Sequence, residues 1–108
     1  MPTIDPRREA AIAEHYDFPS QIVKLEEECN ELLEALGQFG NLGRDLDMAH
    51  VIEECVDVGI IIRRIELFAD RDPMFKGLFQ KLYEFKALRQ EIRIAIGDET
   101  FGGKCQEA

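Results

Sequence analysis

The chain is poor in positive charge and has no long apolar run. Its 108 residues include 13 lysines and arginines against 22 aspartates and glutamates, giving a net charge of −9. This balance argues against nucleic acid or an anionic membrane as a main partner, because both favour basic surfaces. The apolar run at 58–62 is far too short to span a membrane. The first residues lack the basic-then-apolar layout of a signal peptide, so we expect a cytoplasmic protein.

Cysteine is also scarce. Cys29, Cys55 and Cys105 make an odd count without any C-x-x-C spacing, which argues against a disulfide framework or a zinc site. Cys29 and Cys55 fall on apolar helix stripes and are expected to be small core residues. Cys105 lies in a polar, glycine-containing tail at 98–108, which we expect to be loose and to expose it.

Proline and glycine divide the rest of the chain into four helical stretches, and no segment alternates with the period of a strand. The stretches are expected at about 6–15, 20–36, 45–69 and 73–97, with Asp5 capping the first and Asp72 the fourth. A glycine-rich loop is expected at 37–44. The pattern predicts an all-α fold, a four-helix bundle forming one domain over 1–97.

Two carboxylate pairs dominate the chemistry of the sequence. Glu28 and Glu31 lie three apart in the second helical stretch, and Glu54 and Asp57 lie three apart in the third. Residues with this spacing are neighbours on a helix surface. In the second stretch an apolar stripe runs beside the glutamates, so for that helix alone a solvated acidic face is the simpler interpretation. That stripe comprises Ile22, Leu25, Cys29, Leu32, Leu33 and Leu36.

The second pair sits in a helix that is apolar on nearly every side, which predicts burial, in part by another subunit. Its apolar residues are Val51, Cys55, Val58, Ile62, Ile65 and Ala69 on one stripe, and Ile52, Val56 and Ile60 on another. Buried carboxylates are costly unless they are paired, protonated or bound to metal. Ion pairs of Glu54 with His50, or of Asp57 with Arg64, are one interpretation. The other is that the two helices lie side by side and four carboxylates bind magnesium, calcium or manganese.

The motif residues resemble a known family. Gln21-x-x-Lys24-Leu25-x-Glu27-Glu28-x-x-Glu31-Leu32, followed after 22 residues by Glu54-x-x-Asp57, is similar to the E-E-x-x-E and E-x-x-D signature of the MazG-like, all-α nucleoside triphosphate pyrophosphohydrolases. The similarity covers roughly residues 15 to 90. It implies a MazG-type fold assembled as a homodimer or homotetramer. It also implies Mg²⁺-dependent (Mn²⁺ as an alternative) hydrolysis of a nucleoside triphosphate to the monophosphate and pyrophosphate.

The resemblance assigns roles to individual residues. Glu28, Glu31, Glu54 and Asp57 would bind the metal, and Glu27 would orient a ligand or act as base. Cationic side chains are expected to meet the substrate phosphates. Lys86, Arg89 and Arg93 lie on one line of the fourth helical stretch, and Lys81 and Lys24 are further candidates. An exposed basic stripe that pairs with acidic groups is the alternative interpretation of these cations.

Two other functions remain open. Phosphoribosyl-ATP pyrophosphohydrolases have similar size and carboxylate spacing, but typically follow the aspartate with leucine and a tyrosine–histidine pair. Here Asp57 is followed by Val58-Gly59-Ile60-Ile61. The other possibility is a non-catalytic helical module, in which the carboxylates form ion pairs and the apolar third helix mediates oligomerisation.

Overall fold

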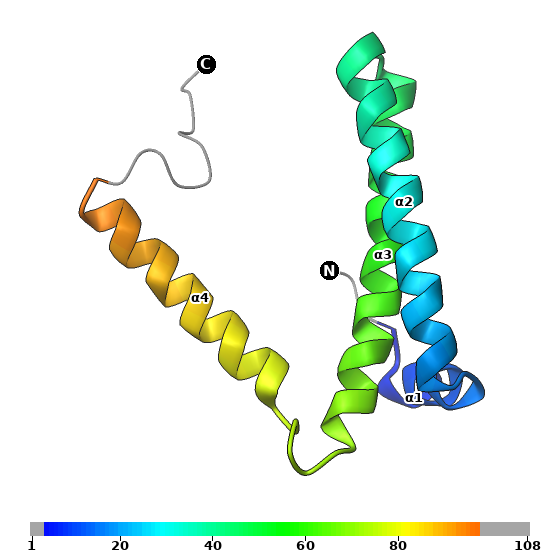
Figure 1. The fold of residues 1–108 in the computed structure, drawn as a ribbon, viewed down its shortest axis with the longest axis vertical. Helices are drawn as coiled ribbons and strands as arrows, with labels where there is room; N and C mark the ends of the chain where they lie inside the picture. The colour runs from blue at the N-terminus through cyan, green and yellow to red at the C-terminus, as the bar shows by residue number, and fades with distance from the viewer. Residues whose placement is uncertain (1–3, 98–108) are drawn as a thin grey trace.

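The computed structural model describes residues 4–97, which form four helices and no strand. These are α1 (Pro6–His15), α2 (Phe18–Leu42), α3 (Asp45–Asp70) and α4 (Leu78–Ala95) (Figure 1). The prediction of an all-α chain is therefore confirmed. The tail expected at 98–108, with Cys105, lies outside the described residues. Over the described part of the chain, no helix is both long enough and apolar enough to cross a membrane.

The starts of α1 and α2 follow from their capping residues. The Asp5 carboxylate accepts a hydrogen bond of 2.8 Å from the backbone N–H of Arg7, and Pro6 occupies the first helical position. Asp17 accepts a similar bond of 2.7 Å from the backbone N–H of Ser20. The first helix therefore has the predicted bounds, whereas the second begins two residues earlier than expected.

The loop predicted at 37–44 is wrong, because α2 continues through Gly37 and Gly40 to Leu42. Each glycine costs a helix only about 1 kcal/mol, which the packing of α2 along α3 can offset. The helix ends at Gly43, whose φ of 62° is the left-handed conformation that glycine adopts without strain. Next, Asp47 accepts a hydrogen bond from the backbone N–H of Arg44 and starts α3 close to the expected place.

The start predicted for the fourth helix is also wrong. Residues 71–77 form turns, and α4 begins only at Leu78. Asp72 caps one of these turns, accepting from the backbone N–H of Met74 at 2.9 Å, while Asp70 accepts from Gly77 at 3.0 Å. Gly77, with a φ of 75°, lets the chain change direction into α4. At the other end, Gly97 follows the helix at a φ of 80°, as its position predicts.

The helices pack as a hairpin with two additions (Figure 1). α2 and α3 lie side by side along their lengths, and α1 packs on α3 near the open end of the hairpin. α4 leans away, and within residues 4–97 it contacts α3 but not α2. The radius of gyration is 17.1 Å, against about 13 Å for a compact domain of this length. A single chain therefore does not close the helices into a compact bundle.

The buried seam between α2 and α3 is partly polar, and most of its residues recur at intervals of seven along each helix. Its buried members are Gln21, Glu28 and Ala35 on α2, and Asp47, Val51, Glu54 and Ile61 on α3. The solvated face predicted for Glu28 is therefore wrong. The apolar stripe predicted on α2 is exposed at Ile22, Leu33 and Leu36. On α2 the partner helix covers the series Gln21, Glu28 and Ala35, whose members are seven residues apart. The more apolar residues beside this series therefore point outward.

The outward faces leave much apolar surface uncovered. Cys29 is half-buried, but Cys55 is exposed, contrary to the prediction of a core residue. The expected buried face of the fourth helix is exposed as well, because α4 leans away from α2; it comprises Phe75, Leu78, Phe79, Leu82, Phe85, Ile92 and Ile96.

Candidate metal centre

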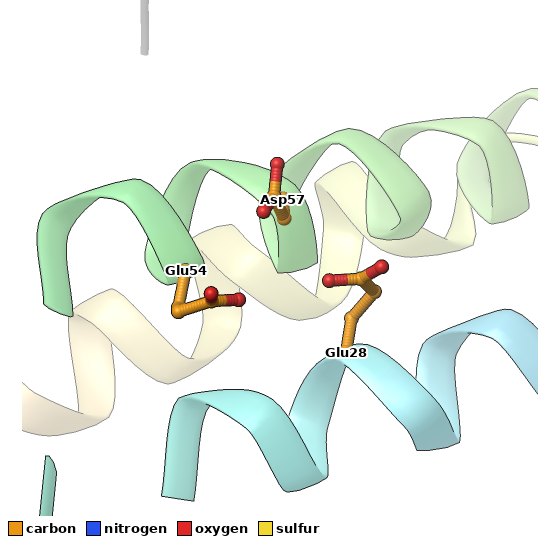
Figure 2. Close-up of side chains that lie close together, drawn as sticks. All are labelled: Glu28, Glu54 and Asp57. Atoms are coloured by element: carbon orange, nitrogen blue, oxygen red, sulfur yellow. The ribbon is translucent and has the colours of Figure 1, made fainter. Parts of the chain in front are cut away.

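Three carboxylates meet at the middle of the α2–α3 seam. Figure 2 shows Glu28 reaching from α2 toward Glu54 and Asp57 on α3. One oxygen from each of the three side chains lies within 4.8 Å of the others. Glu28 and Glu54 are each only 7 % exposed, and Asp57 is half-buried. Like charges this close repel one another unless protons or cations neutralise them.

The hairpin places these residues by simple helix geometry. Glu28 occupies the seam position of α2, seven residues after buried Gln21 and seven before buried Ala35. On α3, Glu54 occupies a seam position seven residues before buried Ile61. Asp57 lies one turn further along the same side of α3. The buried residues on either side of the carboxylates along the seam are therefore both polar and apolar: Gln21, Ala35, Asp47, Val51 and Ile61.

In each buried glutamate one carboxylate oxygen contacts a nitrogen of a neighbouring side chain and the other does not. Glu28 Oε1 lies 3.1 Å from Lys24 Nζ, and Glu54 Oε1 lies 3.1 Å from His50 Nε2. The second oxygen, Oε2, of both Glu28 and Glu54 is buried and has no hydrogen-bond partner among residues 4–97. Burying an oxygen in this state costs free energy that a ligand can recover. Hard carboxylate oxygens are the ligands that magnesium and manganese prefer, so the residues present fit a divalent cation.

Glu31, the fourth carboxylate of the motif, lies at the edge of this centre. It is exposed and does not belong to the group of three. The negative charge of Glu28 raises the pKa of the Glu31 carboxyl above its ordinary value, and partial burial and the charge of Glu54 add to the effect. Glu31 is therefore close enough to interact electrostatically with both buried glutamates.

Glu27 and Lys24 lie on the outer side of the centre. Glu27 is exposed, with its carboxylate 3.6 Å from Lys24 Nζ. Lys24 also binds Glu28, and hydrogen bonding to Glu28 raises the pKa of the Lys24 amine above its ordinary value. In this structure the ammonium of Lys24 is therefore directed to carboxylates of its own helix.

The basic residues of the fourth helix lie on α4, which among residues 4–97 contacts α3 but not α2. Lys81, Lys86 and Arg89 are exposed on α4, and Arg93 is half-buried there. The ribbon of α4 leans away from α2, the helix that carries Glu28 (Figure 1).

The polar contacts of His50 and Arg64 beside the centre were only partly predicted from the sequence. The ion-pair interpretation offered two examples: His50 does contact Glu54, whereas Arg64 donates to the side-chain oxygen of Gln21 at 3.2 Å and not to Asp57. The guanidinium of Arg64 also lies 4.8 Å from the centre of the Tyr16 ring. Gln21 is 2 % exposed, and its seven-residue spacing to Glu28 was the signal that could have revealed the polar seam.

A hollow of about 360 Å³ lies beside His50, at the α2–α3 turn. Its lining residues are Gln38, Arg44, Leu46, Asp47, Ala49, His50 and Glu53. Arg44 is bound to Asp47 through two hydrogen bonds of 2.8 and 3.1 Å, which lower the pKa of the Asp47 carboxyl. This guanidinium therefore stabilises the start of α3.

Comparisons with protein-family models, with curated proteins and with solved structures gave no match to this chain.

Proposed function

We propose that this protein is a magnesium-dependent nucleoside triphosphate pyrophosphohydrolase that serves nucleotide-pool housekeeping. It would cleave between the α and β phosphates, releasing a nucleoside monophosphate and pyrophosphate. The observation that carries the proposal is the pair of buried oxygens without partners, Glu28 Oε2 and Glu54 Oε2, inside a group of three carboxylates. The E-E-x-x-E and E-x-x-D pattern, which resembles the MazG-like signature, supports it independently.

In this proposal the chain supplies the ligands and the electrostatic setting. Glu28, Glu54 and Asp57 hold the cation, and Glu31 at the edge joins them or accepts the proton of the attacking water. A bound magnesium ion neutralises phosphate charge and lowers the pKa of a water molecule. The raised pKa of Glu31 makes its carboxylate a better proton acceptor than an ordinary glutamate. Glu27, exposed beside Lys24, would orient these groups.

We further propose that the active form is a homodimer or homotetramer with a MazG-type arrangement. The described helices expose large apolar side chains that a second copy would cover, among them Leu33, Ile52 and Phe85. The uncovered apolar face of α4 would pack against helices of a second copy. That packing would bring the cationic side chains of α4 to the phosphates of the substrate. The cationic side chains are Lys81, Lys86, Arg89 and Arg93.

Pyrophosphate release from a panel of ribo- and deoxyribonucleoside triphosphates, with magnesium or manganese, tests the proposal. Groups that merely orient a metal ligand change activity by about 10- to 100-fold, so loss of a ligand in Glu54→Gln should exceed this. The matched control is Glu53→Gln, which neutralises the neighbouring, exposed carboxylate of the same helix. Absence of pyrophosphate from every canonical and common modified triphosphate would reject the proposal.

The non-catalytic oligomerisation module is favoured by one observation, the extent of exposed apolar surface, which needs no carboxylate chemistry. The same two variants separate the two functions. In a module, Glu54→Gln lowers stability or disrupts the oligomeric state, and no nucleotide is turned over by the wild type. Turnover of phosphoribosyl-ATP alone would identify the other enzyme considered.

A further inference from the structure

We propose that Lys24 and His50 are a matched pair of positioning residues for the cation site. Each holds one oxygen of the buried glutamate four residues further along its own helix and thereby aims the other oxygen into the centre. The inference rests on the divalent cation site of the proposed function and adds to it residues that touch neither cation nor substrate.

The two contacts have the same geometry. Lys24 Nζ lies 3.1 Å from Glu28 Oε1, and His50 Nε2 lies 3.1 Å from Glu54 Oε1. In both glutamates it is Oε2 that is buried without a hydrogen-bond partner in the described part of the chain. The Lys24 ammonium can only donate, and His50 donates in the tautomer that carries the hydrogen on Nε2, because an ionised carboxylate can only accept hydrogen bonds.

This division of the oxygens has a consequence for metal binding. A carboxylate is planar, so fixing one oxygen and the side-chain stem leaves the second oxygen little freedom. Groups that orient metal ligands in this way commonly change metal affinity by about 10- to 100-fold. The donors approach from outside, since the side chains of Lys24 and His50 are 48 % and 46 % exposed, whereas those of both glutamates are 10 % exposed.

The inference also revises the role expected for Lys24. The sequence suggested that its ammonium binds substrate phosphate, but the structure directs it to Glu28 and Glu27. A phosphate-binding lysine changes the affinity for nucleotide, while a positioning lysine changes the affinity for cation in the absence of nucleotide. The two roles are therefore distinguishable in the nucleotide-free protein.

The chain itself provides the design of the test. On α4, the amide of Gln80 donates to Glu84 Oε1 at 2.9 Å, so glutamine can hold a glutamate four residues later. Lys24→Gln and His50→Gln therefore keep a donor, and Lys24→Met and His50→Met remove it with little change in side-chain length. Glutamine and methionine are both neutral, so the two variants at one position differ in the hydrogen-bond donor and not in charge. This matters because loss of the lysine charge by itself favours cation binding. Gln80→Met, outside the centre, is the matched control.

The experiment is calorimetric titration of Mn²⁺ into the nucleotide-free, full-length protein and its variants, with unfolding midpoints recorded alongside. We expect the Mn²⁺ dissociation constant to be at least about tenfold larger for methionine than for glutamine at positions 24 and 50. Gln80→Met should bind as the wild type does. Because the substituted side chains are half exposed, we expect the variants to remain folded.

Three other outcomes overturn the inference in different ways. Equal affinities for glutamine and methionine variants, with nucleotide turnover intact in the wild type, would reject positioning and leave the proposed function standing. Failure of the wild type to bind Mn²⁺ would reject both. An increase in KM for nucleotide in Lys24→Gln and Lys24→Met alike, with unchanged Mn²⁺ affinity, would return Lys24 to phosphate binding.

Discussion

Neutralising one member of the carboxylate group should stabilise the protein when no cation is present. The oxygens of Glu28, Glu54 and Asp57 lie within 4.8 Å of one another. Two unit charges at that separation repel by about 3.5 kcal/mol at an effective dielectric constant of 20. Glu54→Gln removes two of the three repulsions while keeping the shape of the side chain. Water and the ammonium of Lys24 offset part of each repulsion, so we expect a net gain of about 1 to 3 kcal/mol in the free energy of unfolding.

Magnesium should reverse the order of the two proteins. Binding to the native state stabilises it by about 1.4 kcal/mol when the cation is tenfold above its dissociation constant, and by more at higher excess. The wild type gains this stabilisation, and Glu54→Gln loses most of it. Urea denaturation followed by circular dichroism, in EDTA and in millimolar magnesium, measures both effects, and Glu53→Gln serves as the control. A Glu54→Gln variant less stable than the wild type in EDTA, with a wild type indifferent to magnesium, would refute the reasoning.

Ile61→Ala, at a position 4 % exposed in the seam, should lower the free energy of unfolding by about 2 to 4 kcal/mol, whereas Leu46→Ala, at a position 72 % exposed, should change it by no more than about 0.5 kcal/mol; urea denaturation compares them. Since the pKa of Glu31 is raised in the folded protein, its contribution to stability is present below the ordinary value of 4.5 and is lost as pH rises through the folded pKa. Urea unfolding in EDTA from about pH 4 to about pH 7 should show this decline in the wild type and a smaller one in Glu31→Gln. Phe85→Glu, in the uncovered face of α4, should weaken self-association in sedimentation velocity, and an unchanged sedimentation coefficient would argue that this face is not an interface.

Local signals predicted the helices well where capping residues decide their ends. Asp5 with Pro6 fixed the start of α1, and Gly97 marked the end of α4. The errors occurred where packing outweighed propensity. Gly37 and Gly40 were expected to end a helix, yet α2 runs through both because it packs on α3 along its length.

The sequence predicted which carboxylates come together better than it predicted which helix face is buried. The spacing suggested that four carboxylates converge, and the structure brings together Glu28, Glu54 and Asp57 but leaves Glu31 at the edge. The helical wheel of α2 misled, because it assigned the inner face to the most apolar stripe. In the hairpin the inner face belongs to the seven-residue series through Gln21 and Glu28, which only the partner helix can select. In the proposed assembly, the outer stripes would be covered by helices of a second copy, and the sequence of one chain does not say which ones.

Anomalous X-ray diffraction from crystals grown with Mn²⁺ and a triphosphate that resists cleavage between the α and β phosphates tests the central claim most directly. The account predicts manganese bound by Glu28, Glu54 and Asp57, with Glu28 Oε2 and Glu54 Oε2 as ligands and the α and β phosphates adjoining it. Manganese bound only at other carboxylates, or a triphosphate bound away from the α2–α3 seam, would contradict it.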